Sequence, residues 1–243
     1  MYLQFGFSKG AIMKTIGLLG GMSWESTVGY YRAINQGVKQ TLGGLHSAKI
    51  VLVSVDFAEI EACQSRGDWE TAGALLAAGA RQLKSAGAEC LLICTNTMHK
   101  VADAVNAATN LPLIHIADAT AEQLVADKVA KVGLLGTAFT MEQDFYTGRL
   151  RTHGLDVIVP EEVDRHIVHR VIYEELCLGH TSASSKAEYL RIIDLLRANG
   201  AEAVILGCTE IGLLVTSADT AVPLLDTTAI HAQKAVEFAL QNN

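Results

Sequence analysis

The sequence predicts an α/β fold of two pseudo-symmetric lobes, each a mainly parallel sheet flanked by helices. Short apolar runs alternate with longer amphipathic stretches, which is the pattern of strands alternating with helices over a parallel sheet. The same pattern occurs twice along the 243-residue chain. Half of the residues are hydrophobic, so the chain can bury one large core or two modest ones.

Eight apolar runs are expected to form strands, and amphipathic stretches between them are expected to form helices. The strands are predicted at residues 15–20, 50–56, 89–94, 111–116, 131–136, 155–160, 202–207 and 222–226. The longest helices are predicted at residues 24–40, 71–87 and 186–200. The last two end at Gly87 and Gly200, because glycine favours the backbone angles of a helix C-cap. Residues 1–12 precede a second methionine, Met13, and are interpreted as a tag or upstream extension.

An internal repeat divides the chain into two similar halves. The matching positions are Gly17 and Gly133, Gly87 and Gly200, and Pro112 and Pro223, which lie 116, 113 and 111 residues apart. Three matches in the same order and at similar spacing indicate two copies of one α/β unit. We therefore expect one lobe from residues 13–117 with 227–243, a second from residues 118–226, and an active site in the cleft between them.

Charge and cysteine content exclude several classes of protein. The formal net charge is −7 with no cluster of lysine or arginine, so a nucleic-acid partner is not expected. No apolar run approaches the roughly 18 to 20 residues that cross a bilayer, so no membrane association is expected. Five irregularly spaced cysteines and no secretory signal argue against disulfides and for the cytoplasm. No CxxC pair or histidine cluster predicts a metal site.

Two residues at matching places in the repeat form the candidate catalytic pair. Thr95 lies six residues after Glu89, and Cys208 lies six residues after Glu202. Both follow a predicted strand, and ligands of open α/β sheets bind beyond the carboxyl ends of strands. If the lobes face each other, these side chains approach one ligand from opposite sides. Inversion at a carbon needs that arrangement, because one group removes a proton and the other delivers one from behind.

Loops at the same strand ends are expected to bind the substrate. Turns between a strand and a helix present unpaired amides and hydroxyls, which can hold an α-carboxylate. The candidates are Met22, Ser23, Asn96, Thr97, Thr209 and Glu210. Glu210 either polarises a neighbour at the site or caps the following helix. The pair Gly20 and Gly21 either lets backbone approach a ligand or forms a tight turn.

Each candidate also has a purely structural interpretation. Cysteine is often buried, so the cysteines other than Cys208 are expected in the core; these are Cys63, Cys90, Cys94 and Cys177. Only its place at a strand end in the repeat sets Cys208 apart. Thr95 could equally cap a helix. His99 either orients a loop or tunes Thr95.

Longer segments resemble a known family. MKTIGLLGGMSWES at residues 13–26, CTNTMHKVADA at 94–104 and GCTEIGLLV at 207–215 resemble the aspartate/glutamate racemase superfamily, and within it the bacterial amino-acid racemases of the YgeA type. The resemblance spans residues 13–243. It implies a small amino-acid substrate, a reaction without pyridoxal phosphate or another cofactor, an active site between two lobes, and a homodimer.

The first lobe departs from the superfamily, because Thr95 stands where most members carry a cysteine. A thiol has a pKa of about 8.5 and a hydroxyl is a far weaker acid. We therefore expect Cys208 to act as a base without much help, whereas Thr95 needs activation through Asn96, Thr97 or His99. Related enzymes imply that the second cysteine attacks the L enantiomer. The expected reaction has Cys208 removing the α-proton of an L-amino acid, and Thr95 or a water it positions supplying the new one.

Substrate specificity stays open between several choices. Similar racemases bind acidic side chains with an arginine and a lysine, whose places here hold Glu61 or its neighbours and Cys177. The expected substrates are L-aspartate, L-glutamate or a broader set of L-amino acids. The alternatives are a hydantoin racemase, a malonate decarboxylase and an inactive carboxylate-binding module. Binding without α-proton exchange would distinguish the last of these.

Overall fold

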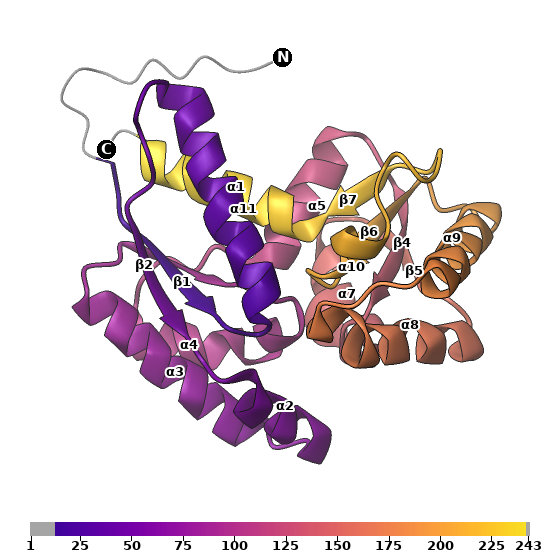
Figure 1. The fold of residues 1–243 in the computed structure, drawn as a ribbon, viewed down its shortest axis with the longest axis horizontal. Helices are drawn as coiled ribbons and strands as arrows, with labels where there is room; N and C mark the ends of the chain where they lie inside the picture. The colour runs from indigo at the N-terminus through magenta and orange to yellow at the C-terminus, as the bar shows by residue number, and fades with distance from the viewer. Residues whose placement is uncertain (1–12, 242–243) are drawn as a thin grey trace. The chain divides into compact units, whose positions relative to one another are not determined.

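The computed structural model describes residues 13–241, so the extension expected at residues 1–12 lies outside the described residues. The chain forms two compact units (Figure 1). Of the described residues, the first unit comprises 13–94, 101–115 and 231–241, and the second comprises 95–100 and 116–230. Among the described residues, no helix is both long enough and apolar enough to cross a membrane.

The first unit is built on a three-stranded parallel sheet with the order β2-β1-β3. Its strands are β1 (Ile16–Gly20), β2 (Ile50–Ser54) and β3 (Cys90–Ile93). Its helices are α1 (Trp24–Leu42), α2 (Phe57–Arg66), α3 (Trp69–Ser85), α4 (Ala102–Thr109) and the part of α11 (Thr227–Leu240) from His231 onward.

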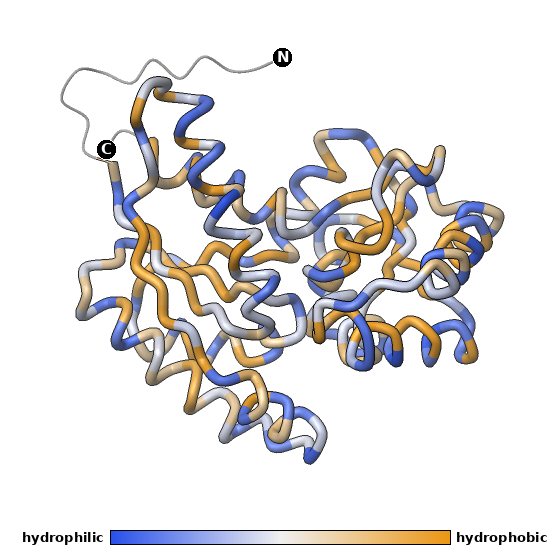
Figure 2. The backbone as a smooth tube through the Cα atoms, viewed as in Figure 1, coloured by the Kyte–Doolittle hydropathy of each residue, from blue (hydrophilic) through white to orange (hydrophobic). Residues whose placement is uncertain are grey.

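Helices cover both faces of this sheet because alternate residues of each strand point to opposite sides. Side chains of β1 and β3 pack against α1 and α11 in one apolar cluster. On the other face α3 approaches closely at Gly79, where a Cβ atom would lie 2.8 Å from a methyl group of Leu19. In Figure 2 the strands are orange, while α3 alternates between blue and orange along its length, as expected of a helix with one buried face.

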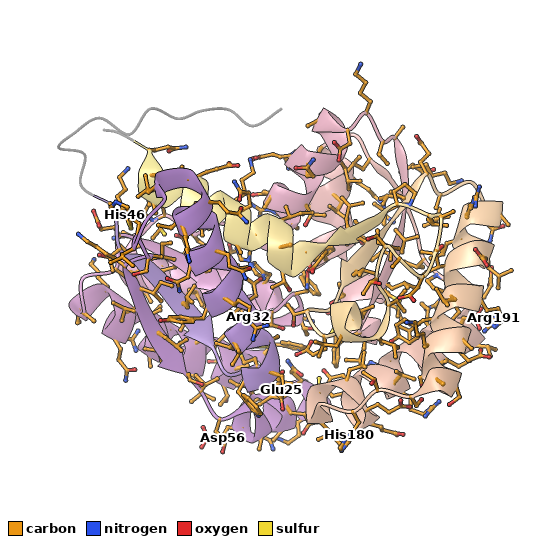
Figure 3. The ribbon with its side chains drawn as sticks, turned by 45° about the horizontal axis from the view of Figure 1, so that its top comes forward. Glu25, Arg32, His46, Asp56, His180 and Arg191 are labelled. Atoms are coloured by element: carbon orange, nitrogen blue, oxygen red, sulfur yellow. The ribbon has the colours of Figure 1, made fainter. Side chains whose placement is uncertain are left out.

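The second unit repeats this arrangement with one more strand, in the order β5-β4-β6-β7. Its strands are β4 (Lys131–Gly136), β5 (Asp156–Ile158), β6 (Ala203–Gly207) and β7 (Leu224–Asp226). Its helical segments are α5 (Ile116–Ala126), α6 (Ala138–Glu142), α7 (Asp144–Thr152), α8 (Glu162–Glu174), η2 (Leu176–Leu178), α9 (Ala183–Ala198) and α10 (Ile211–Leu214). Arg191 of α9 lies at the surface (Figure 3). It bonds both carboxylate oxygens of Asp164 on α8, at 2.5 and 3.2 Å.

The predicted α/β fold and its repeat are confirmed. In both units the first strand lies between the second and the third, and all pairings are parallel. The predicted helix ends at Gly87 and Gly200 are also confirmed, because both glycines have a positive φ just beyond the helix, at 91° and 93°.

The strand predicted at residues 111–116 is wrong. Leu113 forms only an isolated bridge with Leu91, through the Leu91 N–H to the Pro112 carbonyl and the Ile114 N–H to the Leu91 carbonyl. The chain leaves the sheet after Ile114 and turns into α5 at Ile116. This bridge occupies the place that β7 holds in the second unit.

Candidate functional site

Two of the predicted site residues lie in the first unit, in the turn from β1 to α1. The Ser23 side chain caps α1 by accepting the Ser26 N–H at 3.4 Å, and Met22 is buried. Gly21 has a φ of 91°, and a Cβ there would lie 2.2 Å from the Val55 carbonyl oxygen. Of the two interpretations of the glycine pair, the structure supports a tight turn packed against the chain after β2.

The other candidates, including Thr95, lie in the second unit. This differs from the expected lobe boundary near residue 117, because the segment 95–100 groups with the second unit although β3 belongs to the first. Asn96 and Thr97 attach the segment to the second unit by hydrogen bonds to Thr227, Thr137 and Thr140, and His99 accepts a hydrogen bond from Ile116 of α5. Such contacts between residues distant in sequence are invisible to hydrophobic periodicity.

His99 is buried in a single neutral form. The Ile116 N–H is 3.2 Å from His99 Nε2, so Nε2 must be an acceptor without a proton. The proton is therefore on Nδ1, which donates to the Thr95 carbonyl oxygen at 2.8 Å. Both ring nitrogens thus bond the backbone, and His99 contacts the carbonyl of Thr95 rather than its hydroxyl. Of the two interpretations of His99, the geometry supports orientation of the loop.

Asn96 offers a buried acceptor to a ligand. The residue is 1 % exposed, and Nδ2 donates to Thr227 Oγ1 at 3.1 Å. No donor among residues 13–241 reaches Asn96 Oδ1. A buried acceptor without a donor costs about 1–3 kcal/mol, so this oxygen is suited to a ligand that brings an N–H or O–H group.

Thr97 belongs to a buried cluster of three hydroxyls. Its Oγ1 lies 3.0 Å from Thr137 Oγ1 and 3.4 Å from Thr140 Oγ1, and the latter two are 3.2 Å apart. Thr137 also caps α6 by accepting the Thr140 N–H. The sequence interpretation missed Thr137, although the repeat contained a signal, because Thr137 is matched there by Gly21 of the first predicted loop.

Cys208 lies directly after β6 and donates its thiol proton to Glu210. The distance from Sγ to Glu210 Oε2 is 3.0 Å, and the Thr209 hydroxyl donates to the same oxygen at 2.7 Å. Cys208 and Glu210 are 9 % and 2 % exposed. Glu210 makes no side-chain capping bond to α10, so its position supports polarisation of its neighbours rather than capping.

The protonation state of Cys208 corrects one expectation. Burial raises the pKa of the Cys208 thiol well above its ordinary value, and the negative charge of Glu210 raises it further. Cys208 is therefore a neutral thiol at neutral pH in the free protein. It does not act as a base without help, because its proton must first be transferred to an acceptor.

The other cysteines behave as expected of core residues. Cys90 and Cys94 are buried in the apolar cluster of the first unit. Burial raises the pKa of Cys90 to about 12 and that of Cys94 still higher. Cys63 is buried in α2, and Cys177 is half-buried against the core of the second unit.

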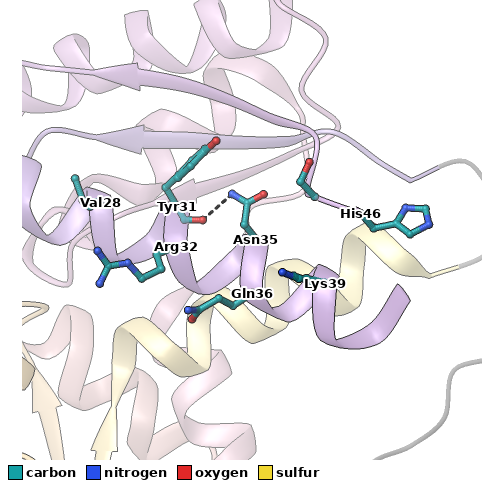
Figure 4. A pocket seen from close by; sticks show the side chains of 8 residues that line it. Val28, Tyr31, Arg32, Asn35, Gln36, Lys39 and His46 are labelled. Atoms are coloured by element: carbon teal, nitrogen blue, oxygen red, sulfur yellow. Dashed lines mark hydrogen bonds between the residues drawn. The ribbon is translucent and has the colours of Figure 1, made fainter. Parts of the chain in front are cut away.

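A surface pocket of about 450 Å³ on α1 contains none of the predicted site residues (Figure 4). Its lining residues are Val28, Tyr31, Arg32, Asn35, Gln36, Lys39, His46 and Ser47. The Asn35 amide already makes hydrogen bonds within the protein, because Nδ2 donates to the Tyr31 carbonyl and Oδ1 accepts the Ala48 N–H. The pocket lies at no strand end and does not contribute to the candidate site.

Comparisons with known proteins agree with the fold. The sequence model of the Asp/Glu/Hydantoin racemase family matches residues 19–235. A candidate Asp/Glu racemase from Yersinia pestis is 60 % identical and superposes with a TM-score of 0.87, covering 94 % of this chain and 100 % of that one. An aspartate racemase homologue from Pyrococcus horikoshii OT3 is 36 % identical, with a TM-score of 0.81 and the same coverage. The broad specificity amino-acid racemase RacX of Bacillus subtilis (strain 168) is 23 % identical over 164 residues, which are 67 % of this chain and 70 % of RacX.

Proposed function

Because this chain belongs to the Asp/Glu/hydantoin racemase family, we propose that it is a cofactor-independent amino-acid racemase acting on L-aspartate, L-glutamate or a broader set of L-amino acids. Racemisation at an α-carbon removes one proton and returns another to the opposite face. The broad specificity of RacX supports testing substrates beyond the two acidic amino acids.

The observation that carries the proposal is the buried acceptor of Asn96 and its link to the strand of Cys208. Asn96 Nδ2 donates to Thr227 Oγ1, and Thr227 in turn donates to the carbonyl of Leu206, two residues before Cys208. Asn96 Oδ1 is left for a ligand. The amino group of an amino acid is a charged donor attached to the carbon that reacts, so it matches this oxygen in chemistry.

The proposed reaction starts with a proton transfer from Cys208 Sγ to Glu210 Oε2, along the existing hydrogen bond. The positive ammonium group of a bound substrate favours this step, because it stabilises the thiolate. The thiolate then takes the α-proton of the L-amino acid and leaves a carbanion. Thr95, or a water that it positions, donates a proton to the opposite face. The proton on Glu210 and the one missing from the Thr95 side recombine through solvent, which closes the cycle without a net change.

Proton NMR in deuterated water tests the proposal. The purified protein is incubated without pyridoxal phosphate with L-glutamate, L-aspartate, a panel of other L-amino acids and a 5-substituted hydantoin. We expect loss of the α-proton signal together with accumulation of the D enantiomer for at least one L-amino acid. Cys208→Ala should abolish both, whereas Cys63→Ala, which removes a buried thiol of the first unit, should retain them. Turnover of the hydantoin alone would overturn the proposed substrate class.

A second candidate function is an inactive carboxylate-binding module. It is favoured by the neutral thiol of Cys208 and by Thr95 at the place of the first cysteine. Calorimetry with the same amino acids distinguishes the two functions. Saturable binding without exchange of the α-proton at any pH between 7 and 9.5 would establish the binding module.

A further inference from the structure

We propose that Thr227 is a positioning residue that holds the Asn96 carboxamide in one orientation, with Oδ1 toward the substrate amine. This inference rests on the proposed function, since it assigns Asn96 Oδ1 to the amino group of the amino acid. Thr227 lies 131 residues from Asn96 in the sequence, so neither the repeat nor the family resemblance predicts this contact.

Counting hydrogens determines the orientation. The Thr227 hydroxyl has one proton, and the Leu206 carbonyl oxygen at 2.9 Å can only accept it. Thr227 Oγ1 then faces Asn96 with lone pairs, so it must receive a proton from the amide nitrogen at 3.1 Å. The flipped amide would place Oδ1 against Thr227 Oγ1, and two acceptors would face each other in a buried site. Only the orientation with Oδ1 away from Thr227 gives the Leu206 carbonyl, the Thr227 hydroxyl and the Asn96 NH₂ group each a hydrogen-bond partner.

The usual function of a threonine at a helix start is already performed by its neighbour. Thr227 is the first residue of α11 and is fully buried. Asp226 Oδ1 accepts the N–H groups of Thr228 and Ala229, at 2.8 and 3.2 Å, and so caps the helix. The Thr227 hydroxyl therefore serves contacts outside its helix, to Leu206 and Asn96.

Strand pairing holds Thr227 at this place. Asp226 is the last residue of β7 and pairs with Leu206 of β6, so the next residue, Thr227, lies beside the end of the strand that Cys208 follows. A displacement of the segment 95–100 relative to β6 would break the bonds of Thr227. Thr227 therefore couples the position of the amine acceptor to that of the thiol.

The test compares Thr227→Val, which keeps the shape and loses the hydroxyl, with Thr227→Ser, which keeps the hydroxyl. In Thr227→Val the amide can flip and present an NH₂ group to the substrate ammonium. We expect kcat/KM for α-proton exchange to fall about 10- to 100-fold, mainly through a higher KM, because the amine contact exists in the ground state as well as the transition state. Thr227→Ser should stay within about threefold of the unchanged protein.

Thr120→Val is the matched control. Thr120 is fully buried, donates to the Ile116 carbonyl at 2.8 Å, and is not among the residues assigned to catalysis or substrate binding. Thermal unfolding of both valine variants reports the structural cost. Binding of L-glutamate and of glutarate, which lacks the amine, reports the specific effect. Thr227→Val should weaken binding of L-glutamate and leave that of glutarate unchanged, whereas a merely structural role would weaken both equally.

The outcomes separate this inference from the proposed function. If the unchanged protein exchanges the α-proton and Thr227→Val matches it in KM and in amine dependence, the positioning role is overturned while the racemase stands. If no L-amino acid is exchanged or bound by the unchanged protein, both are overturned. If Thr227→Val does not fold, Thr227→Ala and the Asn96→Ala variant are compared instead. Unchanged amine-dependent binding in Thr227→Ala together with its loss in Asn96→Ala would contradict the inference, because the amide would then keep its orientation without Thr227.

Discussion

The Cys208 thiol donates to Glu210 Oε2 at 3.0 Å, within a buried pair of residues. The carboxylate favours the protonated thiol, yet it is also the acceptor nearest to the proton that must leave before Cys208 can act. Burial raises the pKa of the Cys208 thiol and Glu210 raises it further, and in the proposed reaction Glu210 also accepts the proton.

A pH-rate profile tests this relationship. Because the pKa of Cys208 is raised, kcat/KM for α-proton exchange should increase as the pH rises from 7 toward 9.5. Glu210→Gln removes the negative charge, so the pKa of Cys208 should fall and the rising limb should move to lower pH. The plateau rate should change little, because above its pKa Cys208 has already lost its proton to solvent and needs no other acceptor.

Alkylation of Cys208 by iodoacetamide measures the thiolate directly. In Glu210→Gln the rise of the alkylation rate with pH should move to lower pH, as in the pH-rate profile. Cys208→Ala measures the background alkylation of the other cysteines. A limb that stays in place or moves to higher pH would show that Glu210 does not set the pKa of Cys208.

Thr95→Cys should relax the preference for L substrates. It places a thiol where the hydroxyl is a weak base, and a thiol loses its proton far more readily. We expect exchange of the D enantiomer to rise about tenfold or more relative to that of the L enantiomer, because one factor of ten corresponds to only 1.4 kcal/mol in the barrier. Thr95→Ser should preserve the original preference. Inversion has equal kcat/KM in both directions because the two enantiomers are equally stable, so the discriminating measurement is α-proton exchange with retention of configuration. Equal exchange of this kind for both enantiomers by the unchanged protein would refute the assignment.

His99→Asn should lower activity without changing the shape of the pH profile. Both ring nitrogens bond backbone groups, so His99 exchanges no proton with the substrate. Loss of the ring leaves the Thr95 carbonyl and the Ile116 N–H without this partner and should destabilise the protein by roughly 1–3 kcal/mol. Urea unfolding and the pH dependence of kcat/KM provide the measurement. Loss of an ionisation from the profile would instead indicate that His99 takes part in proton transfer.

The strands, the repeat and the buried cysteines could be predicted because they depend on local pattern. The residues of β6 form an apolar run that can be recognised from the sequence alone. The end of this run predicts that Cys208 follows a strand. The strand expected at residues 111–116 was wrong because the chain leaves the sheet after Ile114, and the Ile116 N–H bonds His99 Nε2 instead of a neighbouring strand.

The partners of the site could not be predicted because they are distant in sequence. Asn96 bonds Thr227, and Thr97 bonds Thr137, through contacts that only the folded chain creates. The altered pKa of Cys208 is a further example, since it depends on burial beside Glu210 rather than on the residue type. Periodicity identifies which segments are buried, but it does not identify which polar groups meet there.

His231 should make the stability of the first unit depend on pH. Its Nε2 donates to the Ile114 carbonyl at 2.7 Å, so Nδ1 accepts from the Tyr30 hydroxyl at 2.8 Å, and the ring is neutral. Burial lowers the pKa of His231 to about 3 from an ordinary value of 6.5. Below pH 6.5 the unfolded chain therefore binds a proton at His231 that the folded chain does not bind. The free energy of unfolding should fall as the pH is lowered from about 6.5 to 3.

Urea unfolding at pH 7.5, 6, 5 and 4 measures this dependence. The loss from His231 should be on the order of a few kcal/mol across the window, since each pKa unit corresponds to about 1.4 kcal/mol. His231→Gln removes the titrating group, so it should lower stability at pH 7.5 but flatten the fall toward pH 4. The exposed His46 serves as the control, because His46→Gln should leave the slope unchanged. Equal slopes in His231→Gln and the unchanged protein would mean that other groups cause the loss of stability in acid.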